Sequence, residues 1–152
     1  MIKSAILSDD RKHRYLLSRI WDLNSENILF IMLNPSSADE DLNDATTTKV
    51  ISFSKKWGFG GLHICNLYTY RTSSPKKLFS IPKNKRGSNK SEIKKYAKKC
   101  SKVVFAWGNK EKVPTWLNEI VPNPSCIELS KEGVPKHPLY LKSNLKLKSF
   151  SR

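Results

Sequence analysis

The sequence predicts an α/β fold with three layers, in which helices cover both faces of a mostly parallel central sheet. Three short apolar segments, residues 28–33, 62–67 and 102–107, lack the alternation of a half-buried strand and indicate strands covered on both faces. Helical patterns separate these segments, and strands that alternate with helices favour a parallel sheet. The length of 152 residues suits one hydrophobic core, so we expect a single domain over residues 1–152.

Capping and turn signals assign the other elements. The strand expected at residues 14–21 is followed by "DLNSEN", which turns the chain, so that a hairpin opens the fold. A helix is expected over residues 46–57, where apolar residues recur at helical spacing and Asp44 is placed as the N-cap. We also expect helices at 91–100 and 113–121, a strand at 125–129, and basic irregular segments at 68–90 and from 130 onward.

Charge is the strongest deviation from an average protein. The chain holds 28 Lys and Arg against 13 Asp and Glu, which gives a net charge of +15 and a pI near 9.9. Such a chain attracts polyanions, of which nucleic acids are the commonest, so we expect DNA or RNA as the partner. A Lys-rich surface that serves only solubility is the alternative interpretation.

Cysteine spacing and apolar content bound the class of protein. Cys65, Cys100 and Cys126 form no C-x-x-C pair, which argues against a disulfide framework and against a thiolate metal site. No apolar run approaches the ~20 residues that span a bilayer, and the N-terminus lacks the apolar core of a signal peptide. We therefore expect a soluble, cytoplasmic, monomeric protein that does not bind membranes.

Four loops follow the expected strands and should meet at one edge of the sheet. They read "NPSSADEDLND", "NLYTYRTSS", "WGNKEK" and "KEGVPKHPLYL". In a parallel α/β sheet, ligands bind beyond the carboxyl ends of the strands, so this edge is the expected site. Asn34 stands directly at a strand end before Pro35, and its amide can orient a water or read the edge of a base.

Carboxylates and one histidine on these loops are candidates for chemistry. The carboxylates of this loop can act as a general base or stabilise a developing cation, and they belong to Asp39, Glu40, Asp41 and Asp44. Asp44 is equally well explained as a helix cap, and Glu40 and Asp41 as solvated side chains. His137 can donate a hydrogen bond to a base carbonyl, although a lone histidine is more often structural.

Aromatic and basic groups share the second loop. Tyr68, Tyr70 and Arg71 can stack on bases and hold phosphates, and Lys76 and Lys77 follow shortly after. Tyrosines at this position also suit an ordinary strand end. No two histidines are spaced as metal ligands and no phosphate-cradling glycine motif is present, so we expect no metal and no cofactor.

Four stretches carry a resemblance to a known family. They read "YLLSRIW", "IMLNPSSAD", "FSKKWGFGGLHICNLYTYRTSSP" and "VVFAWG". Together they resemble a family of small bacterial and phage proteins that is labelled only as a domain of unknown function. The resemblance runs from about Arg14 to Gly108.

The same landmarks are similar, more distantly, to the uracil-DNA glycosylase superfamily. "LNPS" is similar to the catalytic loop G-x-N-P-G of its mismatch-specific branch, "CNLYTYRTSSP" and "FAWG" to two later strand ends, and "KHPLYL" to the last active-site loop. Leu33 replaces the superfamily glycine, and Leu139 replaces the serine after His-Pro. Branches with an iron–sulfur cluster need four cysteines, so the resemblance points to a branch without a cluster.

This resemblance implies a uracil-DNA glycosylase-like domain that flips a base out of DNA and cleaves its N-glycosidic bond. Occurrence in bacteria and phages suggests a modified pyrimidine, such as a hypermodified base of phage DNA, and a role in defence against phages. By this likeness Asn34 positions water, Asp39 or Asp44 is the carboxylate, and His137 assists the leaving base. The base would be bound by Pro35, Ser36, Asn66, Tyr68 and Trp107, and DNA by Arg71, Lys76, Lys77, Lys110, Lys136 and Lys142. Trp107 is equally well explained as a core residue.

Three other functions stay open at this stage. The chain is alternatively a non-catalytic nucleic-acid-binding protein of the same fold, an enzyme that acts on free modified nucleotides, or a structural protein. The residues leave open which base is removed, and whether the DNA is single- or double-stranded.

Overall fold

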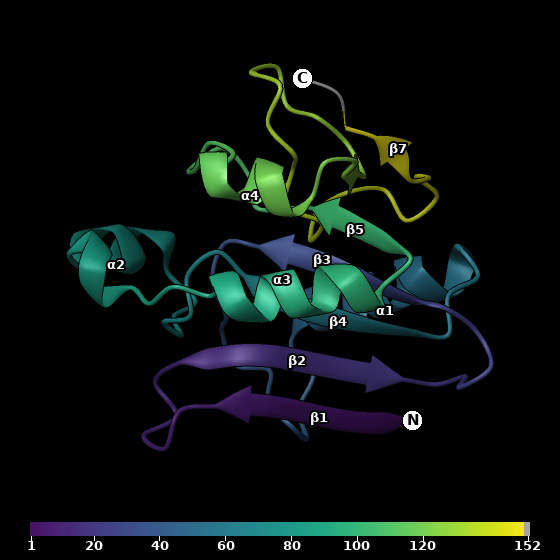
Figure 1. Cartoon of the computed structure of the whole chain (residues 1–152), viewed down its shortest axis with the longest axis horizontal. Coiled ribbons are helices and arrows are strands. Elements are labelled where there is room, and N and C mark those ends of the chain that lie inside the picture. The colour runs from purple at the N-terminus through teal and green to yellow at the C-terminus, as the bar shows by residue number, and fades with distance from the viewer. Residues whose placement is uncertain (151–152) are drawn as a thin grey trace.

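The structure is a computed structural model and describes residues 1–150. Within them, a seven-stranded mixed sheet and four α-helices form an α/β fold (Figure 1). The strand order across the sheet is β1-β2-β4-β3-β5-β6-β7. The strands are β1 (Ile2–Leu7), β2 (Arg14–Ile20), β3 (Asn27–Met32), β4 (Gly61–Asn66), β5 (Lys102–Phe105), β6 (Ser125–Cys126) and β7 (Lys148–Ser149). The helices are α1 (Ala45–Lys56), α2 (Pro75–Ser80), α3 (Lys90–Lys99) and α4 (Thr115–Ile120), with a short 3-10 turn at Lys83–Lys85.

The four central strands run parallel and create the main crevice of the sheet. β3 pairs in parallel with β4 on one side and with β5 on the other, and β5 pairs in parallel with β6. Across the sheet these strands follow one another as β4, β3, β5 and β6. If they are numbered by their order in the chain, the sheet order is 2-1-3-4, which is a doubly wound order. Ligand sites in such sheets lie where the order reverses, which here is between β3 and β5.

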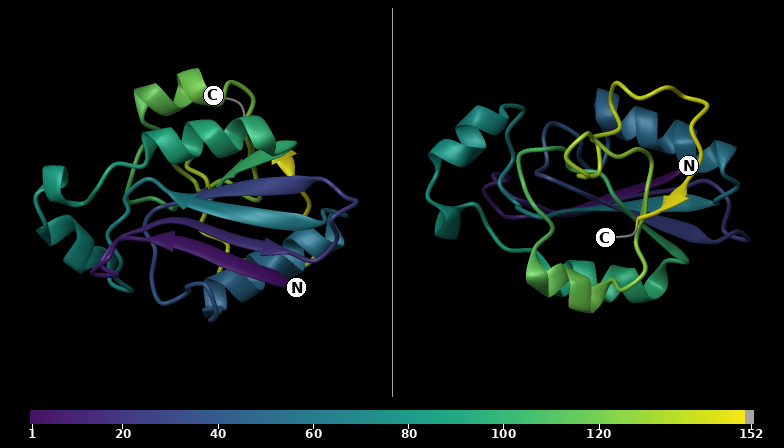
Figure 2. Two further views of the ribbon diagram at one scale, coloured as in Figure 1. Left: turned by 60° about the horizontal axis from the view of Figure 1, so that its bottom comes forward. Right: turned by 90° about the horizontal axis from the view of Figure 1, so that it is seen from above.

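Helices pack on both faces of the sheet because both faces of its central strands are apolar. Along β3, successive side chains alternate between the faces, so that Phe30 belongs to one core and Ile31 to the other. The core around Phe30 includes Val50 of α1, whereas the core around Ile31 includes Ile93 of α3 and Leu117 of α4. Figure 2 shows α1 on one side of the sheet, with α3 and α4 on the other.

The α/β class and most of the expected elements are confirmed, but the sheet is mixed rather than mostly parallel. The expected hairpin between residues 14–21 and 28–33 is wrong, because β2 pairs antiparallel with β4. The N-terminal hairpin is instead formed by β1 and β2. β3 is buried on both faces and needs two strand partners, which places it at the centre of the sheet and keeps the more polar β2 nearer its edge.

The sequence patterns missed β1, α2, the 3-10 turn at Lys83–Lys85, and β7, which lies in the tail expected to be irregular from residue 130 onward. The side chains of β1 are mostly exposed, so the strand carries no apolar signature. The segment 68–90, expected to be irregular, contains α2, whose N-terminus is capped by Ser74 accepting a hydrogen bond from Lys77 N–H at 3.2 Å. None of the helices within residues 1–150 has the length and apolar character needed to cross a membrane.

Arg19 anchors the acidic loop that follows β3. Its side chain is fully buried, and Nη2 donates to the carbonyl oxygens of Asp39 at 2.6 Å and Leu42 at 3.0 Å. Its Nε donates to the Asn43 side chain at 2.7 Å. On the outside of the same loop, the exposed Arg11 forms salt bridges with the carboxylates of Asp39 and Glu40. The loop is therefore held from two sides by positive charge.

We predict that Arg19→Met lowers the free energy of unfolding by about 2–3 kcal/mol, because the Asp39 carbonyl oxygen and the Asn43 side chain lose the charged donor that holds them. Arg11→Met is the matched control. It removes a positive charge that contacts the same loop, but exposed ion pairs contribute little to the free energy of unfolding. Urea unfolding followed by tryptophan fluorescence measures both variants. Equal reductions in the two variants would contradict the anchoring role of Arg19.

A second prediction concerns acid stability. Burial, assisted by Lys99, lowers the pKa of His63 to about 4, below its ordinary value of 6.5. The unfolded chain therefore binds more protons between these two pH values, and stability falls as the pH falls. Replacing His63 with Asn should flatten this decline by at most about 3 kcal/mol, measured as urea midpoints across that pH range. An unchanged slope in the variant would refute the prediction.

Candidate active site

A pocket of about 610 Å³ opens at the carboxyl ends of β3, β4 and β5. It lies at the point where the order of the parallel strands reverses, and its volume falls within the ~300–1,000 Å³ of small-molecule sites. Residues from all four loops that the sequence predicted to converge line this pocket. The predicted site residues among them are Asn34, Pro35, Ser36, Asn66, Asp44, Trp107, Lys110 and His137.

Asn34 is held in one orientation by backbone carbonyl groups. Its NH2 group donates to the carbonyl oxygen of Thr72 at 2.7 Å and to that of Pro35 at 3.1 Å. These acceptors require the amide nitrogen on their side, so the amide cannot be flipped. Its Oδ1 accepts no hydrogen bond from residues 1–150, and the side chain lines the pocket. Asn34 thus offers an acceptor to a water or a ligand.

Asp44 caps α1 and also lines the pocket. It is the N-cap of α1, because Oδ1 accepts from both the N–H and the hydroxyl of Thr47 at 2.8 Å. Its Oδ2 accepts from Ala38 N–H at 3.3 Å. The same carboxylate lines the pocket. The predicted cap is confirmed, and capping fixes the carboxylate where a ligand can reach it.

His137 presents a hydrogen-bond donor when it is neutral. Its Nδ1 accepts from Leu139 N–H at 3.2 Å, so the proton of the neutral ring resides on Nε2. Burial lowers the pKa of His137, and the Asp44 carboxylate acts in the opposite direction. At neutral pH the ring is therefore an uncharged Nε2–H donor in the pocket wall.

Arg14 is a pocket residue that sequence reasoning missed as a functional group. It begins β2, is 3% exposed and lines the pocket. Its Nη1 donates to the Ala38 carbonyl at 3.0 Å and its Nη2 to Asn66 Oδ1 at 3.2 Å. Burial lowers the pKa of Arg14 to about 10, against the opposing effect of Asp44, so the side chain stays charged at neutral pH. A charged residue at the start of an apolar strand was the available signal.

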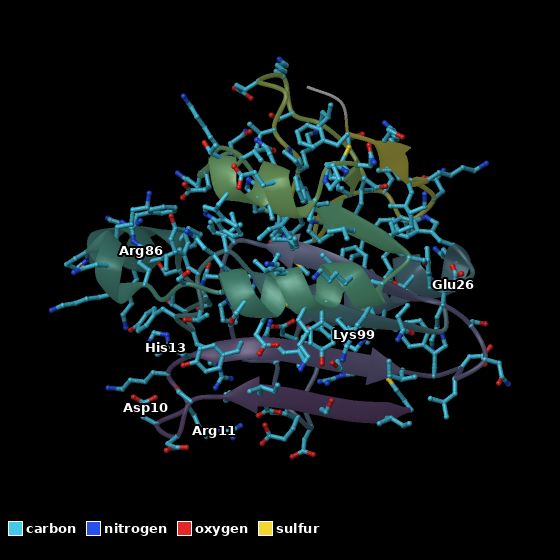
Figure 3. All side chains as sticks on the ribbon, in the orientation of Figure 1. Asp10, Arg11, His13, Glu26, Arg86 and Lys99 are labelled. Carbon is cyan, nitrogen blue, oxygen red and sulfur yellow. The ribbon has the colours of Figure 1, made fainter. Side chains whose placement is uncertain are left out.

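Trp107 and Tyr68 hold the loop that follows β5. Trp107 lines the pocket, and its indole N–H donates to the Glu111 carbonyl at 2.8 Å. The Tyr68 hydroxyl donates to the Glu111 carboxylate at 2.8 Å, and burial, followed by Glu111, raises the pKa of Tyr68. Arg86 lies over the Tyr68 ring at the α2 end of the molecule (Figure 3). Tyr68 therefore supports the loop carrying Lys110 and does not itself line the pocket.

Asp39, the other predicted catalytic carboxylate, does not line the pocket. Its Oδ1 accepts from the N–H groups of Asp41 and Leu42, both at 2.8 Å, and these hydrogen bonds lower the pKa of Asp39. The carboxylates of Asp39, Glu40 and Asp41 lie within 4.8 Å of one another. Arg11 pairs with two of them, so a protein cation offsets part of the negative charge of this cluster.

The predicted DNA-binding residues occupy different environments. Arg71 donates to the carbonyl oxygens of Ser36 at 2.8 Å and Ser37 at 3.2 Å, and so supports the pocket loop from outside. Lys136 forms a salt bridge with Glu128 at 3.0 Å. The remaining predicted lysines have exposed side chains: Lys76, Lys77, Lys110 and Lys142.

A second hollow of about 560 Å³ adjoins the first and is lined by Pro75, Lys76, Phe79, Ser80 and Lys110. The two hollows share Pro75 and Lys110. Tyr140 lines the first pocket yet is 94% exposed, so it stands at the mouth, and sequence reasoning did not single it out. Basic and aromatic side chains thus surround the entrance.

Comparison with known proteins identifies the family of the chain. No curated protein and no solved structure matches it. The family described as "Protein of unknown function (DUF1643)" matches residues 14–139, a span that includes every pocket-lining residue except Tyr140. The chain therefore belongs to this family of proteins of unknown function.

Proposed function

We propose that the protein is a DNA glycosylase that hydrolyses the N-glycosidic bond of a modified pyrimidine flipped out of DNA. The observation that carries this proposal is the meeting of three groups in one pocket of a strongly basic protein. They are a carboxylate on Asp44, an oriented amide on Asn34 and an uncharged donor on His137. Such groups serve a reaction in which opposite charges develop a few ångströms apart.

The likeness to the uracil-DNA glycosylase superfamily supports the same proposal. The two segments that carry it most directly, "LNPS" and "KHP", contribute Asn34 and His137 to the pocket. The doubly wound order of the parallel strands, with helices on both faces, agrees with a three-layer fold of that kind. We propose that the chain is a divergent relative of that superfamily.

In the proposed reaction, the bond between C1′ of the sugar and the base nitrogen breaks, and its electron pair leaves with the base. The sugar becomes cation-like, and a water held by Asn34 Oδ1 adds its oxygen to C1′. Asp44 stabilises the cation and accepts the proton of this water. His137 Nε2–H donates to the departing base and stabilises its negative charge. Flipping the base into the pocket makes the bond accessible.

We predict that Asp44→Asn lowers base release about 100- to 1,000-fold while DNA binding persists, because the amide preserves a cap acceptor but not the charge. The assay counts alkali-labile abasic sites in uracil-containing, ordinary and hypermodified phage DNA. Asp39→Asn is the matched variant, with the same chemical change on the same loop outside the pocket, and should retain most activity. Inactivation by Asp39→Asn alone would move the catalytic role to that residue.

The absence of abasic sites on every substrate, together with tight binding of DNA, would instead favour a non-catalytic DNA-binding protein.

The salt dependence of DNA binding distinguishes the proposed glycosylase from an enzyme that acts on free nucleotides. DNA affinity should fall steeply with salt, and the Lys76→Gln, Lys110→Gln double variant should reduce the slope of log K against log salt by about 0.9 for each phosphate that the protein no longer neutralises. Lys136→Gln is the control, because its amine is already paired with Glu128. A wild-type slope near zero would favour free nucleotides as substrates.

A further inference from the structure

Arg14 and Asn66 are buried residues of the pocket lining, and together they are called its floor below. Arg14 is a cation that forms no salt bridge with a carboxylate of residues 1–150. Its side chain is 3% exposed. Both of its hydrogen bonds go to uncharged oxygen atoms, the Ala38 carbonyl and the Asn66 amide. Burying a guanidinium in this way costs free energy unless a negatively charged group, such as one on a ligand, pairs with it.

The donors of Arg14 exceed the acceptors that the protein supplies. A guanidinium has five N–H groups, and two hydrogen bonds are formed within the described chain. Its Nε is buried and has no partner there. Asp44 lies nearby but is joined to Arg14 only through Ala38, whose N–H donates to Asp44 and whose carbonyl accepts from Arg14. Arg71 and Arg19 add further positive charge around the floor.

Asn66, beside Arg14, also has N–H donors without an acceptor among residues 1–150. It is 2% exposed and lines the pocket, and its Oδ1 is turned towards Arg14. The NH2 group of the same amide donates to no atom of residues 1–150, so it remains available to a ligand. Arg14 and Asn66 thus offer a positive charge and N–H donors, whereas the acceptors of the same pocket lie on Asn34 and Asp44. Such a surface matches a planar group with acceptor oxygens and negative charge, and it mismatches an exocyclic amine.

We infer that Arg14 and Asn66 form an anion-binding subsite that recognises a negatively charged, acceptor-rich edge of the nucleobase. The charge has two possible sources with the same chemistry: a carboxylate substituent on the pyrimidine, or the ring oxygens of a base that has become anionic. This inference rests on the proposed function for the identity of the ligand as a nucleobase. The buried, unpaired cation itself is independent of that proposal.

Calorimetric titration of free bases into the intact protein tests the inference without any bond being broken. At neutral pH, 5-carboxyuracil should bind at least tenfold more tightly than 5-(hydroxymethyl)uracil, which is similar in size but neutral. Titration of 5-fluorouracil at neutral and mildly alkaline pH distinguishes the sources, because its ring becomes anionic over that range. Tighter binding on ionisation points to the anionic ring, and a preference confined to 5-carboxyuracil points to a carboxylate substituent. Equal affinity for all bases in all conditions would overturn the inference.

Two variants connect the preference to these residues. Arg14→Gln should reduce the discrimination between 5-carboxyuracil and 5-(hydroxymethyl)uracil to less than threefold. Asn66→Asp retains Arg14 but supplies the missing negative charge, so it should abolish anion binding and raise the melting temperature. The control Asn123→Asp makes the same change at an exposed position that does not line the pocket and should affect neither property. Retained anion preference in Asn66→Asp, or a lower melting temperature than the wild type, would contradict an unpaired Arg14.

Failure of this inference and failure of the proposed function give different results. If the protein prefers the anionic base but releases no base from any DNA, the anion-binding subsite is supported and the glycosylase activity is refuted. If the protein makes abasic sites but binds neutral and anionic bases equally, the glycosylase activity is supported and the anion-binding subsite is refuted.

Discussion

The central position of β3 is the constraint on which the rest of the structure depends. Its side chains are buried on both faces, and its backbone is paired on both edges by parallel strands. Each parallel neighbour requires a crossover connection, and the two crossovers contain helices that pack on opposite faces of the sheet. Because the chain leaves the sheet on different sides at this point, a crevice opens beyond Asn34, between the loops that follow β3 and β5.

The acidic loop in this basic protein is explained by the arginines that surround it. Arg19 holds the backbone of the loop from inside, Arg71 supports the adjacent segment, and Arg11 pairs with the carboxylates on the outside. Most of the acidic side chains are therefore used to shape the loop. Asp44 differs, because its carboxylate caps α1 and also lines the pocket. A single carboxylate is thereby positioned at the site by interactions that also stabilise the fold.

The charge distribution connects this site to its proposed substrate. The exposed side chains of Lys76 and Lys110 lie beside the pocket mouth, whereas the interior contains one carboxylate, one uncharged histidine and one buried arginine. The exterior would attract a polyanion without regard to sequence, and the interior would distinguish what enters. Tyr140 and Phe79 add aromatic surface beside the lysines, which suits a nucleic acid strand with unstacked bases.

The sequence by itself determined the α/β class, the central strands, the cap at Asp44 and the meeting of four loops. These follow from local patterns: continuous apolar runs, helical spacing and a capping residue before a helix. It also assigned Asn34, Asn66 and His137 to one rim, because residues at the carboxyl ends of parallel strands share an edge. The tertiary structure alone decided the strand neighbours, which brought Arg14 into the pocket, and it showed that the Asp39 carboxylate lies outside the pocket, where it accepts from Asp41 N–H. Arg14 enters because β2 runs antiparallel to β4, so that its first residue lies where β4 ends, and no local pattern encodes a pairing between strands so distant in the chain.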